Sequence, residues 1–172
     1  EEYGEERAQA IFESLLQRNK ASIRVTDLSR KEEIKALLDA SDSALSASGL
    51  VKEQGHFASH DLFAEGAITI QDESSQLVAP TLDLQGDEQV LDACAAPGGK
   101  TAHMASYLTT GQVTALDLYD HKLTLIQENA QRLGVADRVQ TQKLDARKVH
   151  EFFGKDQFDK ILVDAPCSGI GL

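Results

Sequence analysis

The sequence predicts an α/β fold built on a parallel sheet and preceded by part of a small α+β subdomain. Three observations support this prediction. Four short segments that are expected to be strands alternate with helical segments from residue 87 onward, and the residues before about 66 follow a different order. Hydrophobic residues make up 41% of the 172 residues, an ordinary share for a globular chain. Strands that alternate with helices form parallel sheets with right-handed crossovers.

Residues 1–66 are predicted to form part of the small subdomain. Apolar residues at helical spacing predict a helix over 5–18, and alternation predicts a short strand over 22–25. Ser29 is the expected N-cap of a helix over 30–39, with Glu32 completing a capping box. Residues 40–66 are rich in Ser, Asp, His and Gly, and their pattern allows no assignment.

A connecting segment is predicted at residues 67–86. A strand is expected over 67–70 and a helix over 73–82. Pro80 must lie near the end of that helix or kink it, because proline lacks the backbone N–H. The segment is expected to lead directly into the larger domain.

Residues 87–172 are predicted to form the N-terminal part of the larger α/β domain. Its strands are expected over 89–92, 113–117, 138–142 and 159–164. Helices are expected over 99–108, over the apolar stripe from Leu123 to Leu133 with Gly134 just after it as a C-cap, and over 148–153.

Composition limits the function. The net charge of −11 argues by itself against a nucleic-acid binder, unless a local basic patch or a partner domain offsets it. No apolar run approaches the roughly 20 residues that span a membrane, and the N-terminus does not read as a signal peptide. Cys94 and Cys167 form no zinc-ligand pattern, so we expect no metal site, free thiols and a cytoplasmic location.

Carboxylates follow the predicted strands. Asp92 ends the first strand, Asp117 the second and Asp164 the fourth, and Asp145 lies just past the third. Because open α/β sheets bind ligands at the carboxyl ends of their strands, we expect these side chains to surround one site.

A glycine turn follows the first strand. Gly98 and Gly99 let the backbone approach a ligand closely, at the N-terminus of a helix. Asp117 lies 19 residues after Gly98 and can bind ribose hydroxyls. The pattern fits a dinucleotide or S-adenosylmethionine, but it matches neither GxGxxG nor the P-loop. A tight turn without a ligand is the structural alternative.

The two remaining carboxylates and a thiol have alternative interpretations. Asp145 can accept from an adenine amine or be a surface residue, and Asp92 is either a ligand residue or a structural one. Cys167 stands three residues after Asp164. A thiolate that adds to C6 of a pyrimidine activates C5 toward a methyl donor. The alternative for Cys167 is a buried apolar cysteine.

Asp92–Thr101 together with Asp164–Gly169 resembles the RsmB/Nop2/NSUN-type RNA 5-methylcytosine methyltransferases, and the segment Gly66–Gln76 strengthens the resemblance. The nearest similarity is to the bacterial members that act on 16S rRNA, and it covers about residues 20–172. It implies a Rossmann-like fold that binds S-adenosylmethionine and methylates cytosine C5 in ribosomal RNA.

The resemblance also implies site residues. Those expected to line the S-adenosylmethionine site are Cys94, Ala95, Ala96, Pro97, Gly98, Gly99, Lys100, Asp117, Asp145 and Asp164. Cys167 corresponds to the cysteine that assists release of the methylated RNA.

The family's covalent nucleophile lies in a later Thr-Cys motif, which this chain does not contain. We therefore expect a fragment with an incomplete sheet, inactive by itself, that can self-associate through the open edge of its fourth strand. The full-length protein would bind 16S rRNA. Two alternatives stay open: an NAD-dependent oxidoreductase, and a non-catalytic RNA-binding module of the same ancestry.

Overall fold

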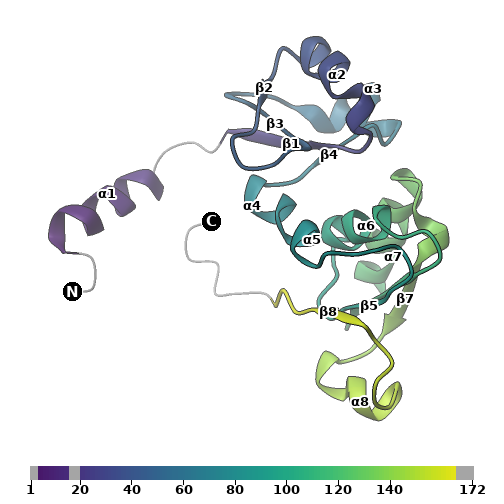
Figure 1. Cartoon of the computed structure of the whole chain (residues 1–172). Coiled ribbons are helices and arrows are strands. Elements are labelled where there is room, and N and C mark those ends of the chain that lie inside the picture. The colour runs from purple at the N-terminus through teal and green to yellow at the C-terminus, as the bar shows by residue number, and fades with distance from the viewer. Residues whose placement is uncertain (1–3, 16–19, 166–172) are drawn as a thin grey trace.

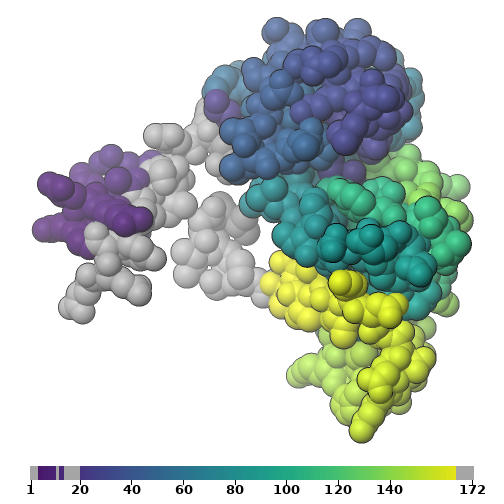
Figure 2. Space-filling model, viewed as in Figure 1, coloured from purple at the N-terminus to yellow at the C-terminus, as the bar shows by residue number. Residues whose placement is uncertain are grey.

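The computed structural model describes residues 4–15 and 20–165 as two lobes with separate sheets (Figure 1). The lobes pack against each other, as Figure 2 shows. Helix α1 (Glu5–Leu15) lies to the side of both lobes and begins where the sequence predicts. Among the described residues, none of the helices combines the length and the apolar character needed to cross a membrane.

The N-terminal lobe is a four-stranded antiparallel sheet in the order β2-β3-β1-β4. Its strands are β1 (Ala21–Val25), β2 (Ser41–Asp42), β3 (Gly49–Lys52) and β4 (Ile68–Ile70). Its helical elements are η1 (Leu28–Arg30), α2 (Lys31–Leu38), η2 (Phe57–Ser59) and α3 (Asp61–Ala64). The buried core combines apolar residues from the strands with Ile34 and Leu38 of α2. Four of these elements fall within residues 40–66, where the sequence pattern allowed no assignment.

The predicted start of the second helix is wrong in its detail. Asp27, and not Ser29, is the capping residue: its carboxylate accepts hydrogen bonds from the Ser29 N–H at 2.9 Å and from the Ser29 hydroxyl at 2.7 Å. This local bond closes the 3₁₀ turn η1, and α2 begins only at Lys31, where Arg30 provides no side-chain cap. An aspartate that bonds to the backbone two residues on is a common alternative to a helix cap.

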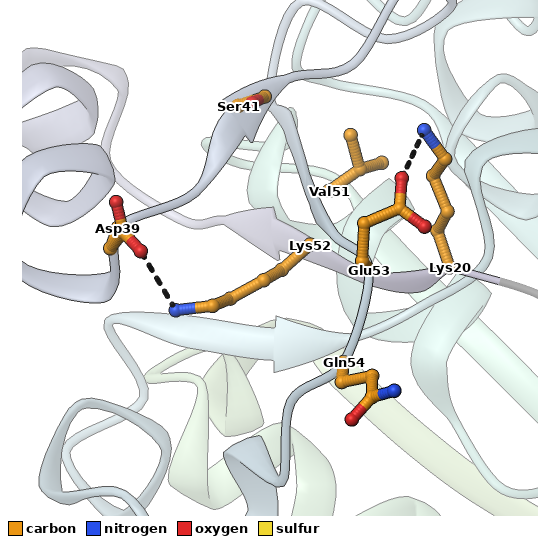
Figure 3. A pocket seen from close by; sticks show the side chains of 7 residues that line it. All are labelled: Lys20, Asp39, Ser41, Val51, Lys52, Glu53 and Gln54. Atoms are coloured by element: carbon orange, nitrogen blue, oxygen red, sulfur yellow. Dashed lines mark ion pairs between the residues drawn. The ribbon is translucent and has the colours of Figure 1, made fainter.

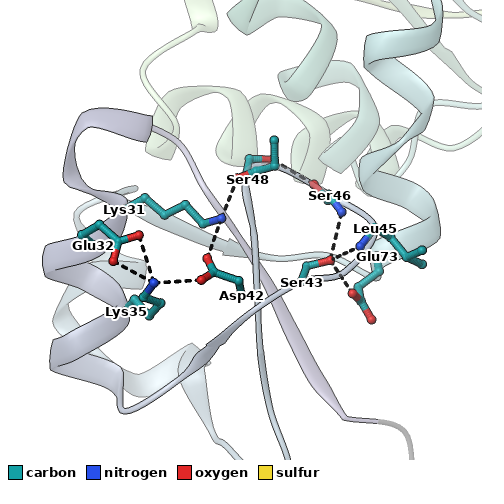
Figure 4. Close-up of polar contacts among 10 residues, drawn as sticks. Lys31, Glu32, Lys35, Asp42, Ser43, Leu45, Ser46, Ser48 and Glu73 are labelled. Atoms are coloured by element: carbon teal, nitrogen blue, oxygen red, sulfur yellow. Dashed lines mark hydrogen bonds and ion pairs between the residues drawn. The ribbon is translucent and has the colours of Figure 1, made fainter.

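A polar network fixes the edge strand β2 (Figure 4). Asp42 pairs with Lys31 at 2.9 Å and with Lys35 at 2.8 Å, both from α2. Hydrogen bonds from Lys35 and Lys31 hold the pKa of Asp42 down at about 2. The neighbouring Ser43 hydroxyl donates to Glu73. The edge strand is thereby tied to α2 and to the helix that follows the sheet.

The connecting segment contains two short helices, α4 (Glu73–Gln76) and α5 (Val78–Thr81), in place of the one helix predicted over 73–82. The break lies at Leu77, just after the residue whose carbonyl would face Pro80 in a continuous helix. Because Pro80 has no N–H and its ring crowds that carbonyl, the chain cannot continue as one regular helix. Strand β4 pairs with β1, so this part of the segment belongs to the N-terminal sheet.

The C-terminal lobe is a parallel sheet in the order β7-β6-β5-β8. Its strands are β5 (Gln89–Asp92), β6 (Gln112–Asp117), β7 (Val139–Lys143) and β8 (Lys160–Leu162). Its helical elements are α6 (Gly99–Ser106), α7 (Asp120–Arg132), η3 (Ala136–Arg138), η4 (Ala146–Lys148) and α8 (Val149–Phe152). The four predicted strands and the predicted helices are confirmed, with ends that differ by a few residues.

Helices α6 and α7 contact each other and both contact β6 and β7, so they cover one face of the parallel sheet. The core between them is built from small and medium apolar side chains, such as Val90, Met104, Leu108 and Ala130. Gly134 follows α7 with φ +69°, as the predicted C-cap requires. Among the described strands, β8 pairs only with β5, and self-association along its outer edge stays a prediction.

Arg132 joins the two lobes. Its guanidinium donates to the carbonyl of Phe63 at 2.8 Å and to the carbonyl of Ile68 at 3.2 Å. It also donates to the Thr69 hydroxyl at 3.2 Å and lies 3.9 Å from the centre of the Phe63 ring. The lobes approach so closely that a Cβ on Gly66, which has φ +76°, would lie 2.1 Å from the Arg132 carbonyl oxygen. The interface is therefore specific and closely packed.

Candidate functional site

The carboxyl ends of the parallel strands meet at one edge of the C-terminal sheet. Asp92 ends β5 and Asp117 ends β6, while Asp145 and Asp164 each come two residues after β7 and β8. The register pairs Asp92 with Leu162 and Asp117 with Lys143, and β6 extends two residues beyond the partner of Asp92, Ala115. The predicted gathering of carboxylates at this edge follows from the parallel order.

Residues 93–98 form a loop between β5 and α6 that is bonded to both neighbouring strands. The Ala93 N–H donates to Leu162 at 2.9 Å, and the Ala95 N–H donates to Leu116 at 3.0 Å. Gly98 has φ +101°, and a Cβ there would lie 2.9 Å from the Cα of Ile126. Gly98 is thus required both by its backbone conformation and by the closeness of α7.

Asp92 lies under this loop. Its side chain accepts a hydrogen bond from the Thr101 hydroxyl at 2.7 Å and another from the backbone N–H of Cys94. Asp92 is only 1% exposed, and this burial raises its pKa to about 6. These bonds support the structural interpretation of Asp92, although it also contributes to the wall of the cavity described next.

A cavity of about 300 Å³ opens between the loop and the connecting segment. Its residues from the C-terminal lobe are Asp92, Cys94, Ala95, Ala96, Pro97, Gly99, Lys100 and Asp164. The opposite wall consists of Ile70, Gln71, Asp72 and Ser75. Lys100, at the start of α6, pairs with Asp164 at 2.5 Å. This ion pair connects α6 to the residues that follow β8.

Cys94 is surrounded by acidic groups. Its thiol has a raised pKa, first because of partial burial and then because Asp92, Asp117 and Asp164 lie near it. A thiol with a raised pKa is a poor nucleophile, since the thiolate is the reactive form. Cys94 is therefore suited to lining a site and unsuited to attacking a substrate.

The structure brings together seven of the predicted site residues and places three others differently. Gly98 is a buried residue of the loop itself, where it allows the turn. The charge of Asp117 helps to raise the pKa of the Cys94 thiol, and the Asp117 carboxylate accepts a hydrogen bond from the Tyr119 N–H at 3.1 Å. Asp145 binds Arg147 at 2.6 Å, which contributes to a pKa lowered to about 2. Neither aspartate lines the cavity as the described residues define it. Cys167 lies outside the described residues.

The wall formed by the connecting segment was not predicted as part of the site. Gln71, Asp72 and Ser75 belong to the polar run that follows β4 directly. A polar run at the end of a strand and before a helix is the signal that could have identified them.

A second hollow, in the N-terminal lobe, is lined by Lys20, Asp39, Ser41, Val51, Lys52, Glu53 and Gln54 (Figure 3). Lys20 pairs with Glu53 at 2.7 Å, and Lys52 pairs with Asp39 at 3.5 Å. The two lysines and two carboxylates balance, so this hollow offers no net charge to a ligand. The cavity at the sheet edge is the stronger candidate.

The fold and the edge cavity together define a Rossmann-like α/β domain of the methyltransferase class. Residues 79–172 match the family of the 16S rRNA methyltransferase RsmB/F, and the chain belongs to that family.

Proteins of similar sequence support this family assignment. The chain is 44% identical over 183 residues to the probable ribosomal RNA small subunit methyltransferase B of Bacillus subtilis (strain 168), covering 99% of this chain and 39% of the relative. It is 42% identical over 110 residues to the ribosomal RNA small subunit methyltransferase B of Klebsiella pneumoniae subsp. pneumoniae, covering 64% of this chain and 25% of that protein. The chain thus spans less than half the length of these relatives.

Solved structures agree on the fold. A methyltransferase homolog protein from Pyrococcus horikoshii has a TM-score of 0.81 at 32% identity, covering 95% of this chain and 56% of that one. The structure of NSun6 from Pyrococcus horikoshii with SFG has a TM-score of 0.82 at 22% identity, covering 96% and 68%. The second likeness supports the fold alone.

Proposed function

We propose that this chain is the part of an RNA cytosine-C5 methyltransferase that binds S-adenosylmethionine, and that the whole protein methylates 16S rRNA. The observation that carries the proposal is the edge cavity. The loop that lines it contains the small residues Ala95, Ala96 and Gly99, which leave room for a ligand, in a chain of the RsmB/F family. The proposed substrate also implies the cytoplasm as the place of action.

The residues present fit this cofactor. The loop from Cys94 to Lys100 and the start of α6 offer backbone donors to the amino-acid part of the ligand. Asp117, at the end of β6, is the proposed acceptor for the two ribose hydroxyls. When bound, S-adenosylmethionine supplies an electrophilic methyl group. The roles of Asp145 at the adenine and of Cys167 in product release are proposals of the same kind.

Calorimetric titration of this chain tests the cofactor. S-adenosylhomocysteine should bind and NADH should not, which separates the methyltransferase from an oxidoreductase. Asp117→Ala should weaken S-adenosylhomocysteine binding by about 1–3 kcal/mol, the cost of leaving hydroxyl groups unpaired. Asp137→Ala, an exposed carboxylate elsewhere, is the matched control and should bind normally.

Activity is tested on the whole protein. A full-length enzyme that transfers labelled methyl groups to 16S rRNA would exclude a non-catalytic RNA-binding module. A full-length protein that binds S-adenosylhomocysteine and RNA but transfers no methyl group would support the module and overturn the enzymatic part of the proposal.

A further inference from the structure

The cavity wall from the connecting segment holds a buried amide with an unused donor. Gln71 is 7% exposed and lines the edge cavity. Its Nε2 atom has no hydrogen-bond partner within the described part of the chain. Since a buried donor without an acceptor is costly, this atom indicates a partner that comes from outside the chain.

Arg24 determines which way the amide points. The Arg24 Nε–H donates to the Gln71 Oε1 atom at 2.9 Å, and both side chains are buried. A guanidinium can only donate, so the amide oxygen must face Arg24 and the NH₂ group must face away from it. Within the described residues, Arg24 forms no ion pair with a carboxylate. Its position is therefore explained by the amide and not by a charge partner.

The free NH₂ group lies next to the start of α6. Gln71 Nε2 is 3.9 Å from the point that a Cβ on Gly99 would occupy, and Gly99 is the first residue of the eight-residue helix. The first backbone N–H groups of a helix have no partner within it and favour a negatively charged acceptor. Lys100, on the opposite wall, is already paired with Asp164 at 2.5 Å, and Asp72 and Asp92 also line the cavity. The amide donor and the helix N-terminus are therefore the groups that suit a carboxylate.

We propose that Gln71 binds the ligand directly: its Nε2–H donates to the carboxylate of the cofactor's amino-acid part, and Arg24 is the positioning residue that holds the amide in this orientation. This inference rests on the proposed function, because the carboxylate is that of the methionine moiety. The N-terminal lobe then takes part in cofactor binding through β1 and the residue after β4.

Two ligands that differ at the carboxylate test the proposal on the full chain. S-adenosylhomocysteine carries the amino-acid group, whereas 5′-methylthioadenosine keeps the adenosine and the thioether without it. Gln71→Leu should weaken S-adenosylhomocysteine binding about 10- to 100-fold, the effect of one hydrogen bond to a charged group, and leave methylthioadenosine binding unchanged. Gln71→Glu keeps an oxygen for Arg24 and removes the donor, so it should fold and show at least the same selective loss.

Arg24→Met should produce a loss of the same kind, confined to S-adenosylhomocysteine, and Arg24→Lys should restore part of it. Gln127→Leu is the matched control, because Gln127 donates to the Thr141 hydroxyl from α7 and lies outside the cavity wall. It should leave the binding of both ligands unchanged.

An equal loss for both ligands in Gln71→Leu and Gln71→Glu, or no loss for either, would overturn the proposal while the wild-type chain still bound S-adenosylhomocysteine. A wild-type chain that bound neither ligand would instead remove the proposed function, and the role of Gln71 with it.

Discussion

The hydroxyl of Thr101 lies 2.7 Å from a carboxylate oxygen of Asp92, and both residues are almost fully buried. This bond joins the end of β5 to the first turn of α6, so it closes the loop that forms one side of the cavity. Thr101→Val removes the hydroxyl and leaves a buried carboxylate with one partner fewer. We expect a loss of about 1–3 kcal/mol in the free energy of unfolding, measured with urea.

Thr101→Ser is the control for that change, because it keeps the hydroxyl and removes only a methyl group. It should retain most of the stability. If Thr101→Val and Thr101→Ser were equally stable, the bond to Asp92 would contribute nothing measurable.

The pH dependence of stability should carry the signature of Asp92. Its pKa is raised to about 6 in the folded protein, chiefly by burial, against 3.8 as the ordinary value. The folded state therefore holds this proton more tightly than the unfolded state, so folding is penalised as the pH rises from about 4 through 6. Asp92→Asn does not titrate. The stability of the variant relative to wild type should rise by about 2 kcal/mol between pH 4 and pH 7.

Chemical denaturation at several pH values measures this difference. A constant offset between the wild type and Asp92→Asn across that range would show that Asp92 titrates normally.

Gly98 should tolerate a side chain less well than Gly134. Both have positive φ, but a Cβ on Gly98 meets the Ile126 backbone at 2.9 Å, whereas one on Gly134 meets nothing within 4 Å. Gly134→Ala should cost about 1–2 kcal/mol, the penalty of the left-handed conformation alone. Gly98→Ala should cost more, and it should also weaken S-adenosylhomocysteine binding because the loop must shift. Equal costs in thermal unfolding would mean that the loop moves away freely.

Arg132 should couple the unfolding of the two lobes. It makes hydrogen bonds to Phe63, Ile68 and Thr69 across the interface, and the lobes have separate cores. Arg132→Met removes these bonds and keeps an apolar stem. We expect a loss of about 2–4 kcal/mol, since two part-buried carbonyls and a hydroxyl lose a charged donor, and a thermal transition that becomes broader or splits in two.

Arg132→Lys tests the geometry of that contact, because a lysine keeps the charge but cannot donate in several fixed directions. It should behave more like Arg132→Met than like wild type. A single sharp transition in both variants would show that other contacts hold the lobes together.

The C-terminal lobe could be predicted from the sequence more fully than the N-terminal lobe, for physical reasons. Strands β5 and β6 are largely buried and are therefore mainly apolar segments, and Gly134 follows the long helix α7 where the pattern requires. Strand β2 consists of two residues, both exposed, and the ion pairs of Asp42 hold it in place. Contacts between residues far apart in the sequence leave no local pattern, which is why residues 40–66 could not be assigned.

The candidate site divides in the same way. The loop from Cys94 to Lys100 and Asp164 could be predicted, because a turn after a buried strand is a local feature. The part played by Gln71 depends on Arg24, 47 residues earlier, and on Gly99, 28 residues later. The pairing of β1 with β4 brings Arg24 to Gln71, and the packing of one lobe on the other brings Gly99 to both.

The edge cavity takes its walls from both lobes, and thermodynamic linkage follows from that arrangement. A ligand held between two bodies binds only the population in which they are docked, so its apparent affinity is reduced by the fraction of molecules that are not. By reciprocity, a bound ligand must strengthen the docking by the same factor. Arg132 is not among the residues that line the cavity, yet it belongs to this equilibrium. Substitutions at the interface are thus expected to change cofactor affinity without touching the cofactor.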